Sequence, residues 1–314
     1  MINSDLFGTS FIRFKQEYLN PLITTVVPQD KTEFWILKNL LGTGRCQFNY
    51  NSKNCFSVIF DKEDYYKTLI AEINCFQNKI SFQIKELKTR FTSSNWHFVT
   101  FYYYSFFNTF QMLLYCHQGY IFIDTEEKRE IESILNSVST GIIQIDKGNY
   151  LFTEDFIDTN GMITVKFTKS PNAGGVHQDT WKRFAEILRT KLIPNADANE
   201  RLIFEQMKNI CTYYGEAFPS LTRNYFNYNP LSYNNDLNEN ITYISQVKEN
   251  FIDKFLSLDA NRLDTLEDKA YVTQFFGIII SSIKEKLYKE YAERNKKINI
   301  AFKEIKKIPY MFIE

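Results

Sequence analysis

Two patterns centred on an arginine have the residue types and spacing for chemistry on a phosphate group. Six residues separate Arg90 from His97, and Arg223 is followed by Asn224 and, five positions on, by Tyr228. An arginine holds a phosphate in a fork of donors, and a histidine can move the proton of a ribose 2′-hydroxyl. Since helix positions i and i+4 share a face and i+5 is close to it, we expect Arg223 and Tyr228 to converge. These five residues are the candidate catalytic set, for cleavage of RNA.

Other chemistries have little support in the sequence. Zinc needs ligands that point at one ion, but Cys116 and His117 are adjacent and would point in different directions on a helix. Gly42-Thr-Gly44 lacks the third glycine of a dinucleotide-binding loop, and no phosphate-binding Lys-Ser/Thr pair follows it. We therefore expect no metal and no cofactor.

The composition excludes several classes of protein. The chain has 314 residues, with 37 Lys or Arg against 37 Asp or Glu, and 44% of it is hydrophobic. A disordered chain would be less hydrophobic and unbalanced in charge. The amino terminus lacks the basic and apolar stretches of a signal peptide, and the most apolar run, Val99–Cys116, carries too many polar residues for a membrane span. We expect a cytoplasmic protein with no membrane partner.

One stretch departs from the overall charge balance. Lys284–Lys307 holds nine Lys or Arg against four Glu and overlaps the end of a helix predicted over Leu266–Ile305. Such a face is either solvated or in contact with nucleic-acid phosphates. The candidate nucleic-acid-binding residues are Lys284, Lys286, Lys289, Arg294, Lys296 and Lys297.

Hydrophobic spacing predicts that most of the chain is helical. Apolar residues recur every three or four positions from Leu69 to Phe91, which favours one helix over Asp61–Phe91 with Asp61 as its cap. An aromatic helix over Asn95–His117 is expected to end at Gly119 and to pack against the first as a hairpin. Further helices are predicted over Gln178–Leu192 (capped by Asp179 or Thr180), Asn199–Tyr214, Leu221–Tyr228, Ile244–Leu258 and Leu266–Ile305.

Residues 120–176 are the least helical part. Tyr120–Ile123 and Ile142–Leu151 have strand character, and Met162–Phe167 alternates with a period of two. A helix over Thr125–Ser137 interrupts these segments. The sequence therefore predicts a mainly α protein: a helical bundle with a small β excursion inserted around residues 120–170.

This pattern suggests three parts. Residues 1–60 are expected to form a helical extension, residues 61–230 the bundle with its β insertion at about 120–176, and residues 231–314 a helical segment packed on the bundle.

Three segments together resemble the HEPN superfamily, small helical-bundle domains common in prokaryotic toxin–antitoxin and anti-phage systems. The aromatic stretch Phe101–Leu114, leading to Gly119, resembles the aromatic helix of those domains. Gly175-Val-His177 resembles the histidine-containing turn before a helix with a phenylalanine, here Phe184. Arg223–Tyr228 resembles the active motif, an arginine, often a polar residue next to it, and a histidine after four to six intervening residues.

The resemblance implies a HEPN-like helical bundle and a metal-independent ribonuclease whose active groups meet across a dimer interface. Arg223 and Asn224 would bind the scissile phosphate, and Arg90 with His97 would complete the site. Tyr228 stands where the family has its histidine, and a tyrosine, with a pKa near 10, is a poor proton carrier at neutral pH.

Three functions follow as expectations. The first is an accessory or scaffold subunit of a prokaryotic anti-phage or conflict system that acts through contacts with a protein partner or a second copy. The alternatives are a ribonuclease of the HEPN type, and a protein that binds nucleic acid through the basic carboxy-terminal helix, with RNA as a possible partner of both.

Overall fold

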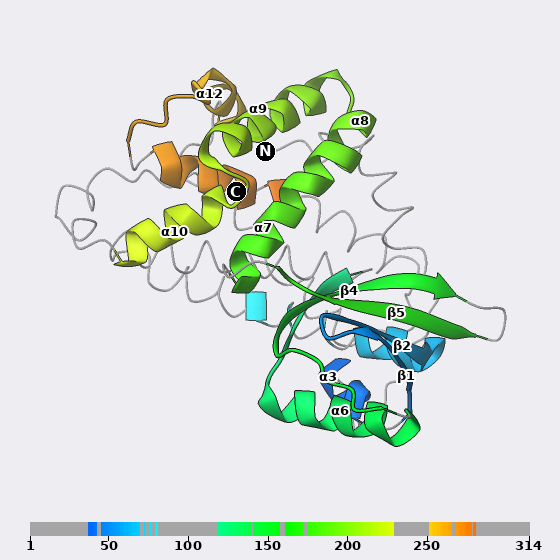
Figure 1. Ribbon diagram of the computed structural model, residues 1–314. Coiled ribbons are helices and arrows are strands. Elements are labelled where there is room, and N and C mark those ends of the chain that lie inside the picture. Colours follow the sequence, from blue (N-terminus) through cyan, green and yellow to red (C-terminus); the bar gives the residue numbers. More distant parts are fainter. Residues whose placement is uncertain are drawn as a thin grey trace. The chain divides into compact units, whose positions relative to one another are not determined.

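The computed structural model describes residues 37–42, 45–69, 72, 76, 79–80, 118–139, 141–157, 161–171, 175–228, 251–265, 268–277 and 279–280. The chain divides into two compact units (Figure 1). One, here called the helical unit, comprises Met1–Asn20, Phe76–Phe110 and His177–Glu314. The other, the sheet unit, comprises Pro21–Cys75 and Gln111–Val176.

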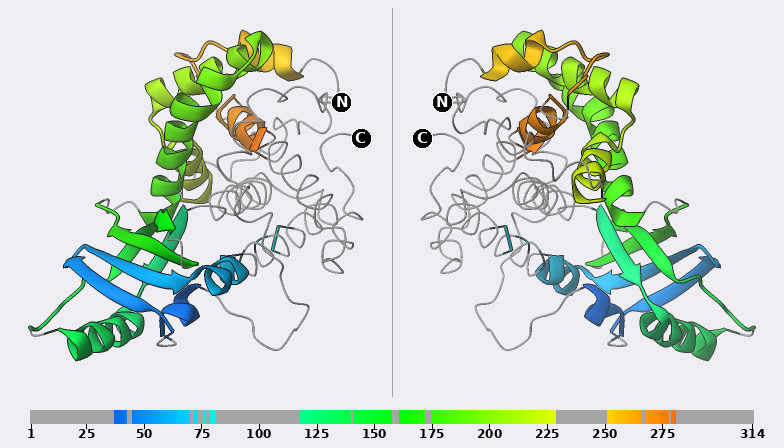
Figure 2. Two further views of the ribbon diagram at one scale, coloured as in Figure 1. Left: turned by 90° about the vertical axis from the view of Figure 1, so that its right-hand side faces the viewer. Right: turned by 90° about the vertical axis from the view of Figure 1, so that its left-hand side faces the viewer.

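The sheet unit is built on five antiparallel strands in the order β1-β2-β5-β4-β3. Helices α3 (Leu37–Gly42) and α6 (Thr125–Val138) lie on the same face of this sheet (Figure 1 and Figure 2). Helix α6 contacts both edge strands, β1 and β3. The strands are β1 (Gln47–Ser52), β2 (Cys55–Asp61), β3 (Gln118–Ile123), β4 (Gly148–Ile157) and β5 (Met162–Lys169).

Alternate residues of the inner strands form the core of the sheet unit. Phe56 of β2 and Phe152 of β4 both lie opposite Phe167 of β5, and the rings of Phe56 and Phe167 stack with centroids 5.0 Å apart. Because side chains along a strand alternate between the two faces, every second residue is buried on one side. The buried set is Phe56, Val58, Phe60, Tyr150, Phe152, Ile163, Val165 and Phe167.

The prediction of a mainly α protein is wrong, because the described residues form a mixed α/β structure with a five-stranded sheet. Strand β1 and all but the last residue of β2 lie within residues 1–60, where we expected a helical extension. Gly119 does not end a helix but lies inside β3 opposite Phe152. The β region is therefore the frame of a whole unit, and its strands come from both sides of the predicted helical hairpin.

Other predicted elements of the sheet unit agree with the structure. The helix predicted over Thr125–Ser137 is α6, and the strands predicted at Tyr120 and at Met162 are β3 and β5. The strand predicted from Ile142 begins later, at Gly148.

Asp61 caps a helix as predicted. Its carboxylate accepts hydrogen bonds from the backbone N–H groups of Glu63 (2.8 Å) and Asp64 (3.1 Å), which satisfies two donors of the first turn. Residues 62–69, 72, 76 and 79–80 are helical, and Leu69 and Ile80 of the predicted apolar stripe are buried. The predicted helix over residues 95–117 lies outside the described residues.

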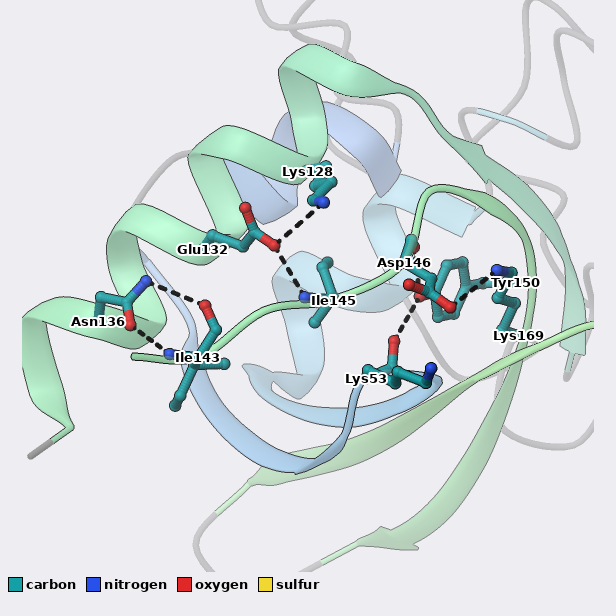
Figure 3. A network of polar contacts seen from close by, with 9 residues as sticks. All are labelled: Lys53, Lys128, Glu132, Asn136, Ile143, Ile145, Asp146, Tyr150 and Lys169. Atoms are coloured by element: carbon teal, nitrogen blue, oxygen red, sulfur yellow. Dashed lines mark hydrogen bonds and ion pairs between the residues drawn. The ribbon is translucent and has the colours of Figure 1, made fainter. Parts of the chain in front are cut away.

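The segment between α6 and β4 is held on one side by α6 (Figure 3). The Asn136 side chain accepts from the N–H of Ile143 (2.6 Å) and donates to its carbonyl (3.2 Å). The Glu132 carboxylate accepts from the N–H of Ile145 at 2.8 Å and pairs with Lys128 at 3.5 Å. These side chains replace the backbone partners that an irregular segment lacks.

The sheet holds the other side of the same segment. The buried Tyr150 hydroxyl donates to the carbonyl of Asp146 at 2.6 Å, and the N–H of Asp146 donates to the carbonyl of Lys53 at 2.8 Å (Figure 3). The Asp146 carboxylate accepts from Lys169 at 3.1 Å. This hydrogen bond, with the charges of Lys169 and Lys53, lowers the pKa of Asp146.

The helical unit contains α7 (Gly175–Ile187), a π-helical turn η1 (Leu188–Leu192), α8 (Ile193–Asn195) and α9 (Ala198–Tyr214). Further along the chain come α10 (Phe218–Tyr228), α12 (Phe251–Ser257) and helical residues 268–277 and 279–280. Helix α9 turns back along η1 and α8, which it contacts (Figure 1).

A cap decides where α9 begins, whereas the caps predicted for α7 lie inside that helix. Asp197 and Glu200 form a capping box at the start of α9, with the Asp197 carboxylate accepting from two backbone N–H groups. The helix predicted from Asn199 is therefore confirmed. Helix α7 starts earlier than expected, at Gly175, so the predicted caps Asp179 and Thr180 lie within the helix, where both are buried.

The π turn between α7 and α8 has a local cause. Pro194 lacks a backbone N–H, and its ring would clash with the carbonyl four residues earlier in a regular helix. The N–H of Ile193 instead bonds to the carbonyl of Leu188, five residues back. The chain thereby stays helical through the proline.

Aromatic residues pack the helical unit. Phe276 lies against Phe184 of α7 and Phe218 of α10, with ring centroids 6.0 and 6.4 Å away. The rings of Phe255 in α12 and Phe275 stack at 3.7 Å. Within the described part of the chain, no helix is long and apolar enough to cross a membrane.

Candidate functional site: the two faces of helix α10

Helix α10 carries Arg223, Asn224 and Tyr228, three of the predicted site residues. It follows a turn at Gly215, whose φ of 89° favours glycine, and the N–H of Phe218 donates to the Gly215 carbonyl at 3.0 Å. Pro219 fits the first turn, where its missing N–H leaves no intrahelical bond unmade. The start of α10 is therefore set by local sequence.

One face of α10 is buried. Arg223 is 8% exposed, and Ser220 and Thr222 beside it are also buried. Helix α10 therefore carries the positive charge of Arg223 into the helical unit. Asn224, the next residue, is half-buried.

The opposite face of α10 is exposed and apolar. Leu221 is 47% exposed, Tyr225 39% and Tyr228 75%. At 3.6 residues per turn, these positions lie within an arc of about 60°. We call these three residues the α10 stripe.

The structure separates Arg223 from Tyr228 rather than bringing them together. Five positions in an α-helix correspond to a rotation of about 140°, and the difference in exposure shows its effect: Arg223 faces inward and Tyr228 outward. Tyr228 therefore does not lie beside Arg223 in the place of a catalytic histidine.

A different histidine lies near Arg223. His177 is in the first turn of α7 and is half-buried. Burial, followed by the positive charges of Arg223 and of the exposed Lys79, lowers the pKa of His177 to about 4. The imidazole is thus neutral near pH 7, and the charge of the buried Arg223 contributes to that state.

Sequence reasoning did not pair His177 with Arg223. It recognised Gly175-Val-His177 as a turn before a helix, and Arg223 as part of a second motif, but no local spacing links the two. The one signal in the sequence that singles out His177 is the scarcity of histidine, since the chain has three.

The remaining predicted site residues lie outside the described part of the chain. These are Arg90 and His97 of the first arginine pattern and the basic set Lys284, Lys286, Lys289, Arg294, Lys296 and Lys297. Their roles stay predictions.

Two of the cysteines that the structure describes, Cys46 and Cys211, are buried free thiols. Among the described residues, no group of three or more His, Cys, Asp or Glu side chains could hold a metal ion. Burial raises the pKa of Cys46 to about 11 and that of Cys211 to about 12, so both are protonated thiols at neutral pH.

Comparison of the chain with protein-family models, curated proteins and solved structures finds no match.

Proposed function

We propose that the chain is a non-catalytic accessory or scaffold subunit that binds a partner protein through the α10 stripe. One observation carries this proposal: Leu221, Tyr225 and Tyr228 are all exposed, at the i, i+4 and i+7 spacing with which a helix enters a groove. Tyrosine adds a large, rigid contact area with a polar tip, and aromatic residues are enriched in interface cores.

The distribution of charge on α10 indicates the chemical character of the surface that a partner would offer. Arg223 is the single charged residue in Phe218–Tyr228, and it is buried on the other side of the helix. The exposed face thus offers apolar area and hydroxyl groups but no charge. It fits an apolar groove, and binding there should depend little on salt.

The setting in an anti-phage or conflict system is supported by the resemblance to the HEPN superfamily alone. Two of the segments that carry this resemblance are described by the structure. Gly175–His177 forms the start of α7, and Arg223–Tyr228 lies in α10. Tyr228 in the histidine position favours the non-catalytic role, because a phenol lacks the ring nitrogen with which a histidine accepts and returns a proton.

The test is co-purification of the tagged full-length chain from its native host. The variant Leu221→Ala/Tyr225→Ala/Tyr228→Ala is compared with the matched control Leu202→Ala/Tyr213→Ala on α9, whose residues are 59% and 61% exposed. We expect a stoichiometric partner that the wild type and the control retain at low and high salt, and that the α10 variant loses.

Two results would contradict the proposal. One is a partner retained equally by both variants, and the other is a wild-type chain that purifies without any partner. Thermal unfolding of each variant checks that its fold is intact.

A further inference from the structure

The antiparallel sheet ends at β1 in an open edge. Of the described strands, only β2 pairs with β1, and in an antiparallel ladder every second residue turns its N–H and C=O away from the neighbouring strand. Apart from Phe48, the residues of β1 are exposed. We propose that β1 of a second copy of the chain pairs with this edge.

A row of aromatic residues across the sheet ends at this edge. Tyr50 of β1 lies opposite Phe56, and Phe56 lies opposite Phe167. Phe167 in turn lies opposite Phe152 of β4. The three phenylalanines are buried, whereas Tyr50 is 40% exposed. Because aromatic pairs across neighbouring strands stabilise a sheet, an aromatic residue on an added strand would continue the row.

Strand β1 itself has the side chains that fit this edge. Phe48 and Tyr50 alternate with Gln47 and Asn49, so the aromatic rings and the amides project to opposite faces. When two copies of β1 pair antiparallel around a two-fold axis, aromatic residues meet on one face and amides on the other. The strand is therefore complementary to itself, as a two-fold contact requires.

Charge does not oppose this pairing. Sheet edges that stay unpaired often carry lysine or proline, and β1 has neither, nor any other charged residue. The formal net charge of the chain is zero, so two copies do not repel each other through their overall charge.

The other edge strand, β3, differs in this respect. The ring of Phe122, which is 50% exposed, lies 5.9 Å from the amine of Lys38. Lys38 also pairs with Glu127 at 2.8 Å. A charged pair thus lies at β3, as is common at edges that stay unpaired, and this contrast favours β1 as the edge that takes up a strand.

The length of β1 sets the strength of the contact. A β-bulge between Tyr50 and Ser52 leaves Gln47–Tyr50 as the regular part of the edge. A ladder this short buries little surface, and small interfaces dissociate readily. We therefore expect a monomer–dimer equilibrium that depends on the protein concentration.

This contact is independent of the proposed docking surface, because β1 belongs to the sheet unit and the α10 stripe to the helical unit. The variant Leu221→Ala/Tyr225→Ala/Tyr228→Ala should therefore self-associate like the wild type. Loss of partner binding with retained self-association, or the reverse, would separate the two proposals.

The experiment is sedimentation equilibrium of the full chain, whose mass is 37.3 kDa, over a wide range of concentrations. We expect the average mass of the wild type to rise towards twice that value. The variants Gln47→Lys/Asn49→Lys and Gln47→Glu/Asn49→Glu should each stay monomeric, because like charges then meet across the contact. An equimolar mixture of the two should associate at least as well as the wild type, because the charges are then opposite.

The matched control Leu202→Lys/Tyr213→Lys adds two charges at exposed positions of α9 and should self-associate like the wild type. Thermal unfolding checks that each variant is folded, and association of the mixture excludes a loss caused by misfolding. A wild type that is monomeric at every concentration overturns the proposal. So does self-association that the lysine variant retains, or that the mixture does not restore.

Discussion

Burial, reinforced by the positive charge of Arg223 on α10, holds the imidazole of His177 on α7 in its neutral form. Burial and the charge of Arg223 act in the same direction, and together with Lys79 they lower the pKa of His177 from 6.5 to about 4. The two residues belong to different helices, so the folded state creates this effect and the unfolded chain lacks it.

This relationship predicts how stability depends on pH. Between about pH 6.5 and pH 4 the unfolded chain protonates His177 while the folded chain does not, so the unfolded state binds more protons and stability falls as the pH falls. Allowing for solvent screening of a half-buried ring, we expect a loss of about 1–2 kcal/mol over this window.

The measurement is chemical unfolding of the wild type and of His177→Gln at several pH values. The variant should lose part of the pH dependence, and the difference between the two proteins isolates His177 from carboxylates that titrate in both. Identical pH dependence in the two proteins would contradict this prediction.

A second prediction concerns the segment between α6 and β4. Tyr150→Phe removes the hydroxyl that donates to the Asp146 carbonyl from a buried position, and should cost about 1–2 kcal/mol of unfolding free energy. Lys169→Met removes the partly exposed ion pair with Asp146 and should cost less. Equilibrium unfolding in urea ranks the two variants, and the reverse order would show that the ion pair is the stronger contact.

The start of α9 allows a third test. Asp197→Ala removes the side chain that accepts from the N–H groups of Asn199 and Glu200, at a cost of about 1 kcal/mol. Asp197→Asn is the matched control, since asparagine caps equally well and should stay near wild type. If thermal unfolding gives the same midpoint for Asp197→Ala and the wild type, the cap does not contribute.

The non-catalytic role predicts that purified protein leaves RNA intact. Tyr228 points away from Arg223, and an imidazole with a pKa of about 4 is a weak base. Incubation with transfer RNA in the presence of a chelator, followed by gel electrophoresis, should show no cleavage. Cleavage that Arg223→Ala or His97→Ala abolishes would favour the ribonuclease instead.

Elements that a local sequence pattern determines were predictable. Helix α6 and strand β5 each show the hydrophobic periodicity of their type, and Asp61 is a residue type that caps helices, placed directly before a helical stretch. Strand β2 was missed although Phe56, Val58 and Phe60 alternate, because Ile59 between them is also apolar and blurs the period of two. Its partner β5 lies far along the chain, and no local signal reports that pairing.

The candidate site shows the same limit. The spacing of Arg223 and Tyr228 suggested that they converge, but burial of one side of α10 decided which residue faces inward. The helices that carry His177 and Arg223 are linked through Phe276, against which Phe184 of α7 and Phe218 of α10 both lie. Contacts of this kind arise from tertiary structure, and the local spacing of residues in the sequence does not predict them.

The pairing of β2 with β5 also has a consequence for how the protein is made. Cys55 and Thr168 are neighbours across the sheet but stand 113 residues apart in the chain. At about 5–20 residues per second, a ribosome needs on the order of ten seconds to supply β5 after β2 has emerged. During that interval Phe56, Val58 and Phe60 lack the strand that buries them, so the nascent chain is a substrate for chaperones and prone to aggregate until residue 169 leaves the exit tunnel.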